Sequence, residues 1–243
     1  MDSTFINRIY PTACYATGSC MAEIIANPIY TVKTRYQTSK TNESMKDVIK
    51  NDYRKYGLSG FYNSVFSAIL ARFVSSFLKF MIYSEIKYYR QTEDNDLYNN
   101  MLNGCTAGIC SSFVVHPIDT MTNYLQRHQP ITKDFFKRDI MYAGFSQTII
   151  RNFFLYSVLF PVFDYTKTMT NNNIPLSCMI TTAISSSILQ YIELRRTRMM
   201  AQEFKTSVFW WKGFPISYIA NATHFTLTMS IMYYLMQYKH FFI

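Results

Sequence analysis

The sequence of 243 residues has few of the residue types and motifs that build enzyme active sites. Its four histidines, His116, His128, His224 and His240, form no local cluster with metal-ligand spacing. It also has no glycine-rich phosphate loop and no cysteine–histidine motif of the kind found at nucleophilic sites. These absences argue against an enzyme, a metal site and a bound cofactor.

Metal-ligand spacing is also missing among the cysteines, and a targeting sequence is missing at the start. The five cysteines all lie in apolar stretches, at Cys14, Cys20, Cys105, Cys110 and Cys178. Their odd number and their spacing predict reduced, packed thiols. The first four residues introduce neither a basic region before an apolar core nor an arginine-rich presequence. Any targeting signal is therefore expected to be internal.

Long hydrophobic runs are lacking as well. Hydrophobic residues make up 49% of the chain and aromatic residues 17%, yet the mean hydropathy is only -0.04. No uninterrupted apolar run reaches about 20 residues, so the usual test for a membrane-spanning helix finds no span. A helical bundle with lipid on one side of each helix and water on the other has such a composition. A soluble helical protein has it too, so hydropathy leaves both classes open.

Acidic residues are scarce relative to basic ones, with 15 against 24, which gives a net charge of +9. Such an excess is typical of a solvated basic surface or of a nucleic-acid-binding protein. Here the basic residues form no block, and most stand singly at the ends of apolar segments, as snorkelling side chains do. This placement favours an anionic lipid or an anionic small solute over nucleic acid.

A degenerate motif occurs three times in the chain, and internal repetition at a long period decides how a fold is interpreted. Its template is a proline, an acid two residues later, bases five and seven residues later, and a glutamine nine residues later. The first copy keeps Pro28, Lys33, Arg35 and Gln37, the second Pro117, Asp119 and Gln126, and the third Glu193, Arg196 and Arg198. In the third copy, Tyr191 replaces the proline.

This triple repeat resembles the signature of the mitochondrial carrier family of metabolite transporters, and matching partner segments follow each copy. The resemblance implies an all-α fold, in which six transmembrane helices form three pseudosymmetric pairs around a central cavity. The three repeats would span residues 1–97, 98–172 and 173–243. Membership implies a multi-pass protein of the mitochondrial inner membrane. The abundance of Asn, Ile, Lys, Tyr and Phe suits an AT-rich protist or a large DNA virus, whose carrier would enter the host mitochondrion.

Six long helices and their connections follow from this reading. We expect helices over about 10–37, up to about 89, up to the second motif, 144–167, from 175 to the third motif, and 213–238. A short surface helix is expected at 43–49, and the third repeat is expected to lack its counterpart. Pro28 and Pro117 remove backbone donors, so each is expected to kink its helix. Gly104 and Gly108 have a spacing that permits close helix contact.

In the resembled family, the acid of each motif pairs with the base of the next, and the ring of pairs closes the cavity on the matrix side. The implied pairs are Asp119 with Arg196, Glu193 with Lys33, and Tyr30 with Thr122, of which the last cannot be ionic. The bland alternative is that these are ordinary charges at helix ends.

Two further features of the gates are implied. Gln37 and Gln126 occupy positions that brace the ring by hydrogen bonds, whereas Met200 at the third position cannot. At the opposite end of the cavity, Asp164 and Lys167 keep the family's second motif, but the other repeats do not. No complete ring pair is therefore expected at that end.

The family's substrate-contact points lie seven residues past the start of the second helix of each repeat. They correspond to Ala71 with Arg72, Arg151 with Asn152, and Ala220 with Asn221. An arginine at mid-membrane depth is costly unless it faces water or an anion, and its guanidinium suits carboxylate or phosphate. Arg151 is the first choice for a substrate-binding residue. Arg72 is the second, with snorkelling as the alternative.

Glu23, on the first helix, occupies another position that can face the cavity. It could bind a proton or pair with Arg151, and a capped buried acid is the bland alternative.

The residues that indicate the substrate class disagree. The run from Arg195 to Met200 is similar to the Arg-Arg-Arg-Met-Met-Met run of ADP/ATP carriers, which favours ATP, ADP or deoxynucleotides such as dATP. Arg151 and Asn152 depart from the pair that adenine-nucleotide carriers have there and look more like carriers of keto acids or dicarboxylates. Nucleotide exchange by alternating access is the prediction, and a di- or tricarboxylate or keto-acid carrier is the alternative. A nontransporting relative or a soluble helical binding protein is a second alternative.

A lipid contact is implied near the last helix. Trp211, Lys212 and Gly213 resemble the family's cardiolipin-binding motif, in which amides at a helix start hold phosphate. A Trp–Lys anchor at the membrane interface, without a specific lipid, is the alternative. The expected partners are therefore a small anionic metabolite and membrane lipid, with no nucleic acid, and the protein is expected to be a monomer.

Overall fold

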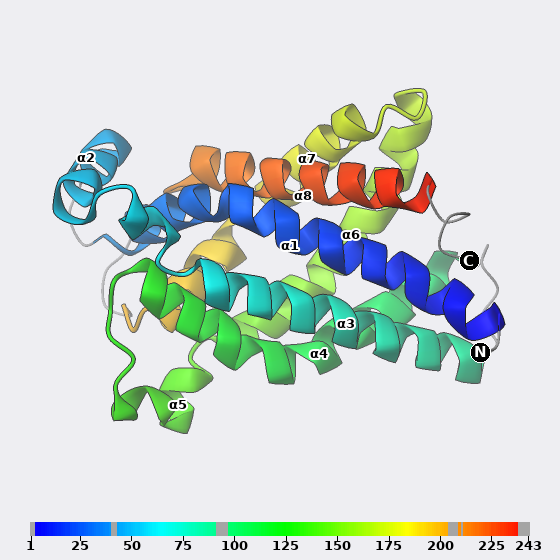
Figure 1. The fold of residues 1–243 in the computed structure, drawn as a ribbon, viewed down its shortest axis with the longest axis horizontal. Helices are drawn as coiled ribbons and strands as arrows, with labels where there is room; N and C mark the ends of the chain where they lie inside the picture. The colour runs from blue at the N-terminus through cyan, green and yellow to red at the C-terminus, as the bar shows by residue number, and fades with distance from the viewer. Residues whose placement is uncertain (1–2, 40–42, 91–96, 204–208, 210, 238–243) are drawn as a thin grey trace.

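The computed structural model describes residues 3–39, 43–90, 97–203, 209 and 211–237 (Figure 1). Six long helices dominate it: α1 (Ser3–Thr38), α3 (Val65–Arg90), α4 (Leu97–Gln126), α6 (Phe145–Met169), α7 (Ile174–Met200) and α8 (Phe214–Gln237). Each packs against two others, in the order α1, α3, α4, α6, α7, α8 and back to α1, so that they close a ring. The described residues contain no strand. The predicted all-α bundle of six helices is confirmed.

Short elements connect the long helices in the first two repeats. They are α2 (Met45–Tyr56), η1 (Ser59–Tyr62), η2 (Lys133–Phe136) and α5 (Arg138–Met141). The surface helix α2 begins two residues later than the predicted 43–49 and continues to Tyr56, and its start is fixed by a capping box. The Ser44 hydroxyl accepts from the Asp47 N–H at 3.3 Å, and the Asp47 carboxylate accepts from the Ser44 N–H at 3.3 Å. The connector of the third repeat lies largely outside the described residues.

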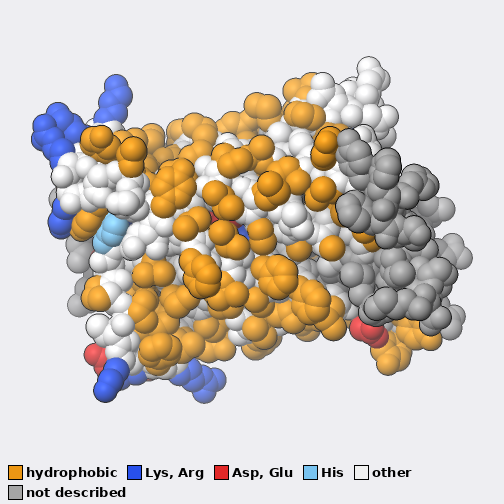
Figure 2. All heavy atoms as spheres, in the orientation of Figure 1, with side chains coloured by type: hydrophobic (Ala, Val, Ile, Leu, Met, Phe, Trp, Pro, Cys, Tyr) orange, Lys and Arg blue, Asp and Glu red, His pale blue; other side chains and the backbone are white. Residues whose placement is uncertain are grey.

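The interior of the ring is polar and its exterior apolar. The largest fully buried side chains are His116, Gln37, Gln190, Glu23, Asn27 and Asn103. Large hydrophobic side chains are instead exposed, among them Phe66, Phe73, Phe113 and Ile219. In Figure 2 apolar side chains cover much of the middle of the molecule, and Lys and Arg gather at the end that carries α2. This arrangement is the reverse of that in a soluble domain and fits helices that face lipid.

The polar interior explains the low mean hydropathy. By length and composition, one described helix could cross a membrane, the segment Ser59–Arg90, whose apolar window has a mean hydropathy of 1.7. The expectation that no segment would pass a hydropathy test is therefore wrong for this helix. In the other long helices, polar residues on the face that points into the ring lower the mean hydropathy along the helix. α7 is the clearest case, because Ser177, Thr181, Ser185 and Gln190 are all buried.

A buried polar residue precedes the proline position of each motif and ties it to the next long helix. Asn27 accepts a hydrogen bond from the Ser64 hydroxyl at 3.3 Å. His116 Nε2 lies 3.1 Å from the Ala143 carbonyl oxygen, and Gln190 Nε2 donates to the Lys212 carbonyl at 3.1 Å. Ser64, Ala143 and Lys212 all lie at the start of the second long helix of their repeat, so a contact forms at the same place three times, through a side-chain hydroxyl in the first repeat and a backbone carbonyl in the other two. We call these contacts the repeat clamps.

A second contact recurs in two repeats, three residues past the proline. Thr31 donates to the Phe61 carbonyl at 3.0 Å, and Thr120 donates to the Met141 carbonyl at 3.1 Å. α1 and α4 run unbroken through Pro28 and Pro117. The predicted kinks at these prolines therefore do not interrupt either helix, and their bend stays a prediction.

Two glycines occupy the left-handed region where the second long helix begins. Gly144 has φ 76° and Gly213 has φ 78°. A Cβ at Gly144 would lie 3.0 Å from Met199 Cβ and 3.3 Å from the Arg196 carbonyl oxygen, so α7 passes directly over this turn. A Cβ at Gly104, by contrast, would meet no neighbouring atom within 4 Å. The prediction of a close helix contact is therefore wrong for Gly104.

Gly144 and Gly104 give a matched test of stability. We expect Gly144→Ala to lower the free energy of unfolding by about 1–2 kcal/mol. The left-handed conformation is unfavourable for alanine, and the added methyl group crowds α7. Thermal unfolding in detergent should then show a melting temperature several degrees lower. Gly104→Ala is the control and should leave the melting temperature unchanged or raise it, because alanine is the better helix former inside α4. Equal melting temperatures for the two variants would contradict this account of the turn.

Candidate functional site

The ring of helices encloses a cavity of about 780 Å³. All six long helices contribute lining residues. Among the described residues, six basic side chains line it, Lys33, Arg72, Lys79, Lys87, Arg151 and Arg196, against three acidic ones, Glu23, Asp119 and Glu193. The cavity therefore carries an excess of positive charge and is suited to an anion.

The predicted substrate-binding residues fall mostly on this cavity. Six of the seven line it: Glu23, Ala71, Arg72, Arg151, Asn152 and Asn221. Ala220 is the exception, because it is fully buried and is not among the lining residues. Its prediction as a contact point is wrong, since α8 turns its neighbour Asn221 toward the cavity instead.

Both ionic pairs implied by the family motif are formed. Lys33 Nζ lies 2.9 Å from Glu193 Oε1, and Arg196 Nη2 lies 2.5 Å from Asp119 Oδ2. The side chains of Lys33, Glu193 and Arg196 are no more than 12% exposed, so water screens them poorly. These pairs join α1 to α7 and α4 to α7. We call them the ion-pair layer.

The third position of the layer has no ionic contact. Tyr30 donates a hydrogen bond to Asn221 Oδ1 at 3.2 Å. Thr122 donates to the Ser67 hydroxyl at 3.1 Å and to the Ile118 carbonyl at 2.9 Å. The implied partners Tyr30 and Thr122 are thus each bonded elsewhere, Tyr30 to α8 and Thr122 to α3.

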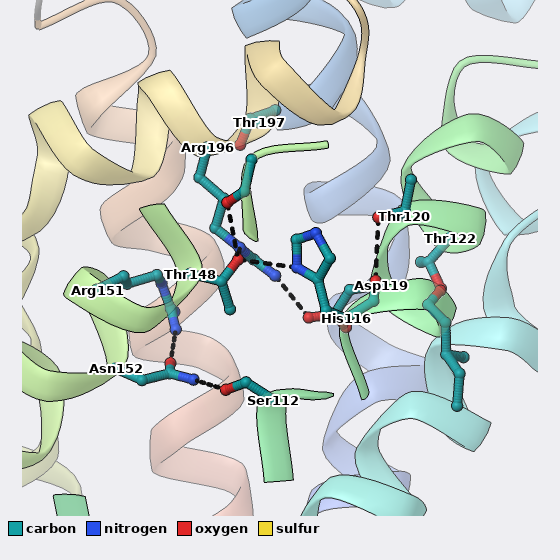
Figure 3. A network of polar contacts seen from close by, with 12 residues as sticks. Ser112, His116, Asp119, Thr120, Thr122, Thr148, Arg151, Asn152, Arg196 and Thr197 are labelled. Atoms are coloured by element: carbon teal, nitrogen blue, oxygen red, sulfur yellow. Dashed lines mark hydrogen bonds and ion pairs between the residues drawn. The ribbon is translucent and has the colours of Figure 1, made fainter. Parts of the chain in front are cut away.

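Arg151 approaches the ion-pair layer directly. Its Nε bonds to Glu193 Oε2, while Lys33 holds the other oxygen of the same carboxylate. Arg151 Nη1 also donates to Asn152 Oδ1 at 3.1 Å, and Asn152 Nδ2 donates to the Ser112 hydroxyl at 2.7 Å (Figure 3). The guanidinium is therefore held against the carboxylate from the side of α4.

The pairing of Glu23 with Arg151, one of the predicted options, is wrong. Glu23 Oε2 instead receives the Arg72 Nε–H at 2.8 Å and lies 3.3 Å from His224 Nε2. The ring order explains the difference, because α1 packs against α3 and α8, whereas α6 packs against α4 and α7. Each arginine therefore binds the acid of an adjacent helix.

No role was predicted for His116 or Thr148, which connect the ion-pair layer to a repeat clamp. Arg196 Nε donates to the Thr148 hydroxyl at 2.9 Å, and this hydroxyl lies 2.9 Å from His116 Nδ1 (Figure 3). Because His116 Nε2 faces a carbonyl oxygen, it must donate, and Nδ1 then accepts from Thr148. The burial of a polar residue just before a motif proline is the signal that could have found this contact.

The two glutamines brace helices rather than ion pairs. Gln37 Nε2 donates to the Ser217 hydroxyl at 3.0 Å, which joins α1 to α8. Gln126 Oε1 accepts from the Thr34 hydroxyl at 2.6 Å, which joins α4 to α1. Within the described residues neither side chain bonds to a charged member of the ion-pair layer, so the predicted bracing of the ring is wrong in that form.

At the opposite end of the cavity, Lys167 has an uncharged partner. Its Nζ lies 3.0 Å from the Tyr233 hydroxyl and 5.1 Å from the centre of that ring. The side chain of Asp164 lies outside the described residues. Tyr233 stands where the family motif has an acid, so a contact forms at the expected place without a second charge.

The predicted lipid motif is engaged within the protein. Lys212 Nζ donates to the Ser39 carbonyl at 3.0 Å and lies 5.2 Å from the centre of the Tyr36 ring. Trp211 packs edge-on against Phe214, with ring centres 4.5 Å apart. The ammonium therefore fixes the end of α1 to the start of α8, and cardiolipin binding there stays a prediction.

Comparisons with known proteins match this chain to one family. The profile of the family described as mitochondrial carrier protein matches residues 9–94 and 93–174. A mitochondrial carrier-like protein of Acanthamoeba polyphaga mimivirus is 29% identical over 231 residues, which cover 90% of this chain and 93% of that protein.

Two cellular relatives match shorter parts of the chain. The mitochondrial thiamine pyrophosphate carrier of Homo sapiens is 26% identical over 122 residues, covering 46% of this chain and 38% of that carrier. The mitochondrial ornithine transporter 1 of Mus musculus is 24% identical over 195 residues, covering 70% of this chain and 65% of that protein.

The ion-pair layer gives a second testable prediction. We expect Asp119→Asn to lower the free energy of unfolding by about 1–3 kcal/mol, because it leaves the poorly exposed Arg196 without its carboxylate. The melting temperature in detergent at neutral pH measures this. Asp134→Asn is the control, since it removes the exposed pair with Lys137, both of whose side chains are at least 70% exposed. A similar fall in melting temperature for both variants would show that the Asp119–Arg196 pair contributes no more to stability than the exposed pair.

Proposed function

The chain belongs to the mitochondrial carrier family, and on that premise we propose that it exchanges anionic nucleotides across the mitochondrial inner membrane by alternating access. The substrates would be ATP and ADP or deoxynucleotides such as dATP. The observation that carries the proposal is the cavity, with six basic side chains against three acidic ones. The likeness to a mimivirus protein supports a viral origin and a host mitochondrion as the location.

Arg151 is the residue that would join substrate binding to opening of the ion-pair layer. An anion in the cavity competes with Glu193 for the Arg151 guanidinium, because both are negative and both lie within its reach. Once Arg151 turns to the anion, Glu193 keeps only Lys33, so the layer holds α7 less strongly. A substrate would in this way weaken the closed end from within the cavity.

The arginine run of the third motif is not itself a phosphate site. Of its three arginines, Arg196 lines the cavity and pairs with Asp119. Arg195 lies against Tyr191, with Nη1 3.3 Å from the tyrosine hydroxyl, and Arg198 is buried. Phosphates would therefore be bound by Arg151 and Arg72, with Lys79 nearer the mouth. The likeness to a thiamine pyrophosphate carrier fits a substrate with a diphosphate group.

A di- or tricarboxylate or keto acid is the second candidate substrate. Arg151 and Asn152 favour it, because they present a guanidinium and an amide side by side, which suits a carboxylate. The likeness to an ornithine transporter shows that relatives also carry amino acids, so the family alone does not decide between the candidates.

Uptake into liposomes tests the proposed function. We expect purified protein to exchange labelled ATP against internal ADP, and Arg151→Ala to lower the initial rate at least tenfold, because the anion loses its main partner. Arg195→Ala is the matched control, since it removes the same side chain from a position that does not line the cavity.

Repeating the uptake measurement with different anions inside and outside the liposomes distinguishes the two substrate classes. Exchange of malate or citrate but not of ATP would favour the second candidate. No exchange of any of these anions by the wild type would overturn the proposed function, and equal rates for the two arginine variants would remove Arg151 from the site.

A further inference from the structure

A second charged cluster lies in the cavity, separate from the ion-pair layer. Glu23 of α1, Arg72 of α3 and His224 of α8 all line the cavity. Arg72 Nε donates to Glu23 Oε2 at 2.8 Å, and His224 Nε2 lies 3.3 Å from the same oxygen. The Glu23 side chain is 2% exposed and that of His224 14%, whereas Arg72 is 39% exposed. The guanidinium is therefore the part of the cluster that an anion can reach.

A carboxylate and a hydroxyl lie near the two ring nitrogens of His224, and within the described residues Nε2 meets the carboxylate at ion-pair distance without a hydrogen bond. Nε2 faces the Glu23 carboxylate, and Nδ1 lies 3.5 Å from the Thr228 hydroxyl, which can accept or donate. A neutral imidazole with the proton on Nε2 fits this environment. So does an imidazolium, in which Nδ1 donates to the hydroxyl while the carboxylate balances the added charge.

The helices around α8 place the following groups near His224. α1 contributes Glu23 and Tyr30, whose ring centre lies 6.1 Å from that of His224. α3 contributes Arg72, with Cζ 5.9 Å from the centre of the Tyr30 ring. α7 presents the uncharged Ser186 to Asn221, one turn before His224. The charged Glu193 of α7 is held by Lys33 and Arg151 instead.

We propose that His224 and Glu23 form a proton-binding site coupled to anion binding at Arg72, so that the protein carries a proton together with its anion. This inference rests on the proposed function. A proton from cavity water binds the Nδ1 lone pair of His224, and its release to water on the other side reverses the step. No other bond is made or broken.

Charge balance gives the coupling its sign. With His224 neutral, Glu23 and Arg72 cancel, and the cluster attracts an anion weakly. With His224 protonated, Glu23 is shared between two cations, and the cluster carries one net positive charge beside the exposed guanidinium. An anion at Arg72 then favours the proton, and the proton favours the anion by the same factor, because linkage is reciprocal.

Proton uptake on binding tests the coupling. ATP is titrated calorimetrically into the full chain in detergent at pH 7.5, in two buffers with different ionisation heats, which gives the number of protons bound per ATP. We expect the wild type to take up as much as about one proton more than His224→Gln, whose amide does not titrate. Protons bound by ATP itself are common to both proteins. His128→Gln is the control, because His128 stacks on Tyr56 away from the cavity lining and should behave as wild type.

The outcomes separate this inference from the proposed function. Binding heat with equal proton uptake in wild type and His224→Gln would overturn the proton site and leave anion binding intact. Absence of binding heat for both ATP and malate would overturn the proposed function, and the coupling with it. Loss of the extra proton in His224→Gln alone supports the coupling.

A measurement on the wild type covers the case in which His224→Gln does not fold. The affinity of the wild type for malate, whose carboxylates stay ionised, and for ATP, corrected for the protons that ATP itself binds, is measured calorimetrically at pH 6.5, 7.5 and 8.5. If one proton binds together with the anion, the affinity should rise up to about tenfold for each unit by which the pH is lowered. An affinity that does not depend on pH would overturn the proposal.

Discussion

The structure depends on one carboxylate, that of Glu193, which is buried between two cations. Lys33 binds one of its oxygens and Arg151 the other, so three helices, α1, α6 and α7, meet on a single side chain. A charge removed from water is tolerable only when it is paired, and here the pairing also fixes how the helices converge. The same carboxylate thus belongs to the ion-pair layer and touches the residue best placed to meet an anion. In the proposed mechanism, the contact between Arg151 and Glu193 therefore takes part both in closing the cavity and in binding the anion.

The remaining polar interior follows from the same constraint. Helices that face lipid outside and a wet cavity inside must place their polar groups inward, and each buried group then needs a partner. The repeat clamps supply such partners at equivalent places, through Asn27, His116 and Gln190. Three different side chains join the same places in the three repeats, so the threefold symmetry is kept in the position of the contact and not in its residue or its donor. The link from Arg196 through Thr148 to His116 then connects one clamp to the ion-pair layer.

The sequence predicted the parts of this structure that repeat. The family resemblance that the repeated motif carries implied the six helices and the pairs Lys33–Glu193 and Asp119–Arg196. It could not show which acid each cavity arginine binds, because that depends on which helices are adjacent in the ring. It missed His116, whose identity differs from that of Asn27 and Gln190, and it misassigned Gln37, whose amide meets a hydroxyl on the neighbouring helix. Hydropathy failed because averaging along a helix hides the difference between its two faces.

The contacts that the described residues form at the two ends of the cavity differ in strength. At the end near the motifs, two partly buried ion pairs and the Arg151 contact join the helices. At the other end, Lys167 meets the neutral hydroxyl of Tyr233, and a hydrogen bond to a neutral acceptor contributes less than one to a carboxylate. If the protein works by the proposed alternating access, the arrangement with the ion-pair layer closed would accordingly be the more stable of the two in an empty cavity. A substrate that takes Arg151 from Glu193 would reduce that difference, so opening would depend on what the cavity contains.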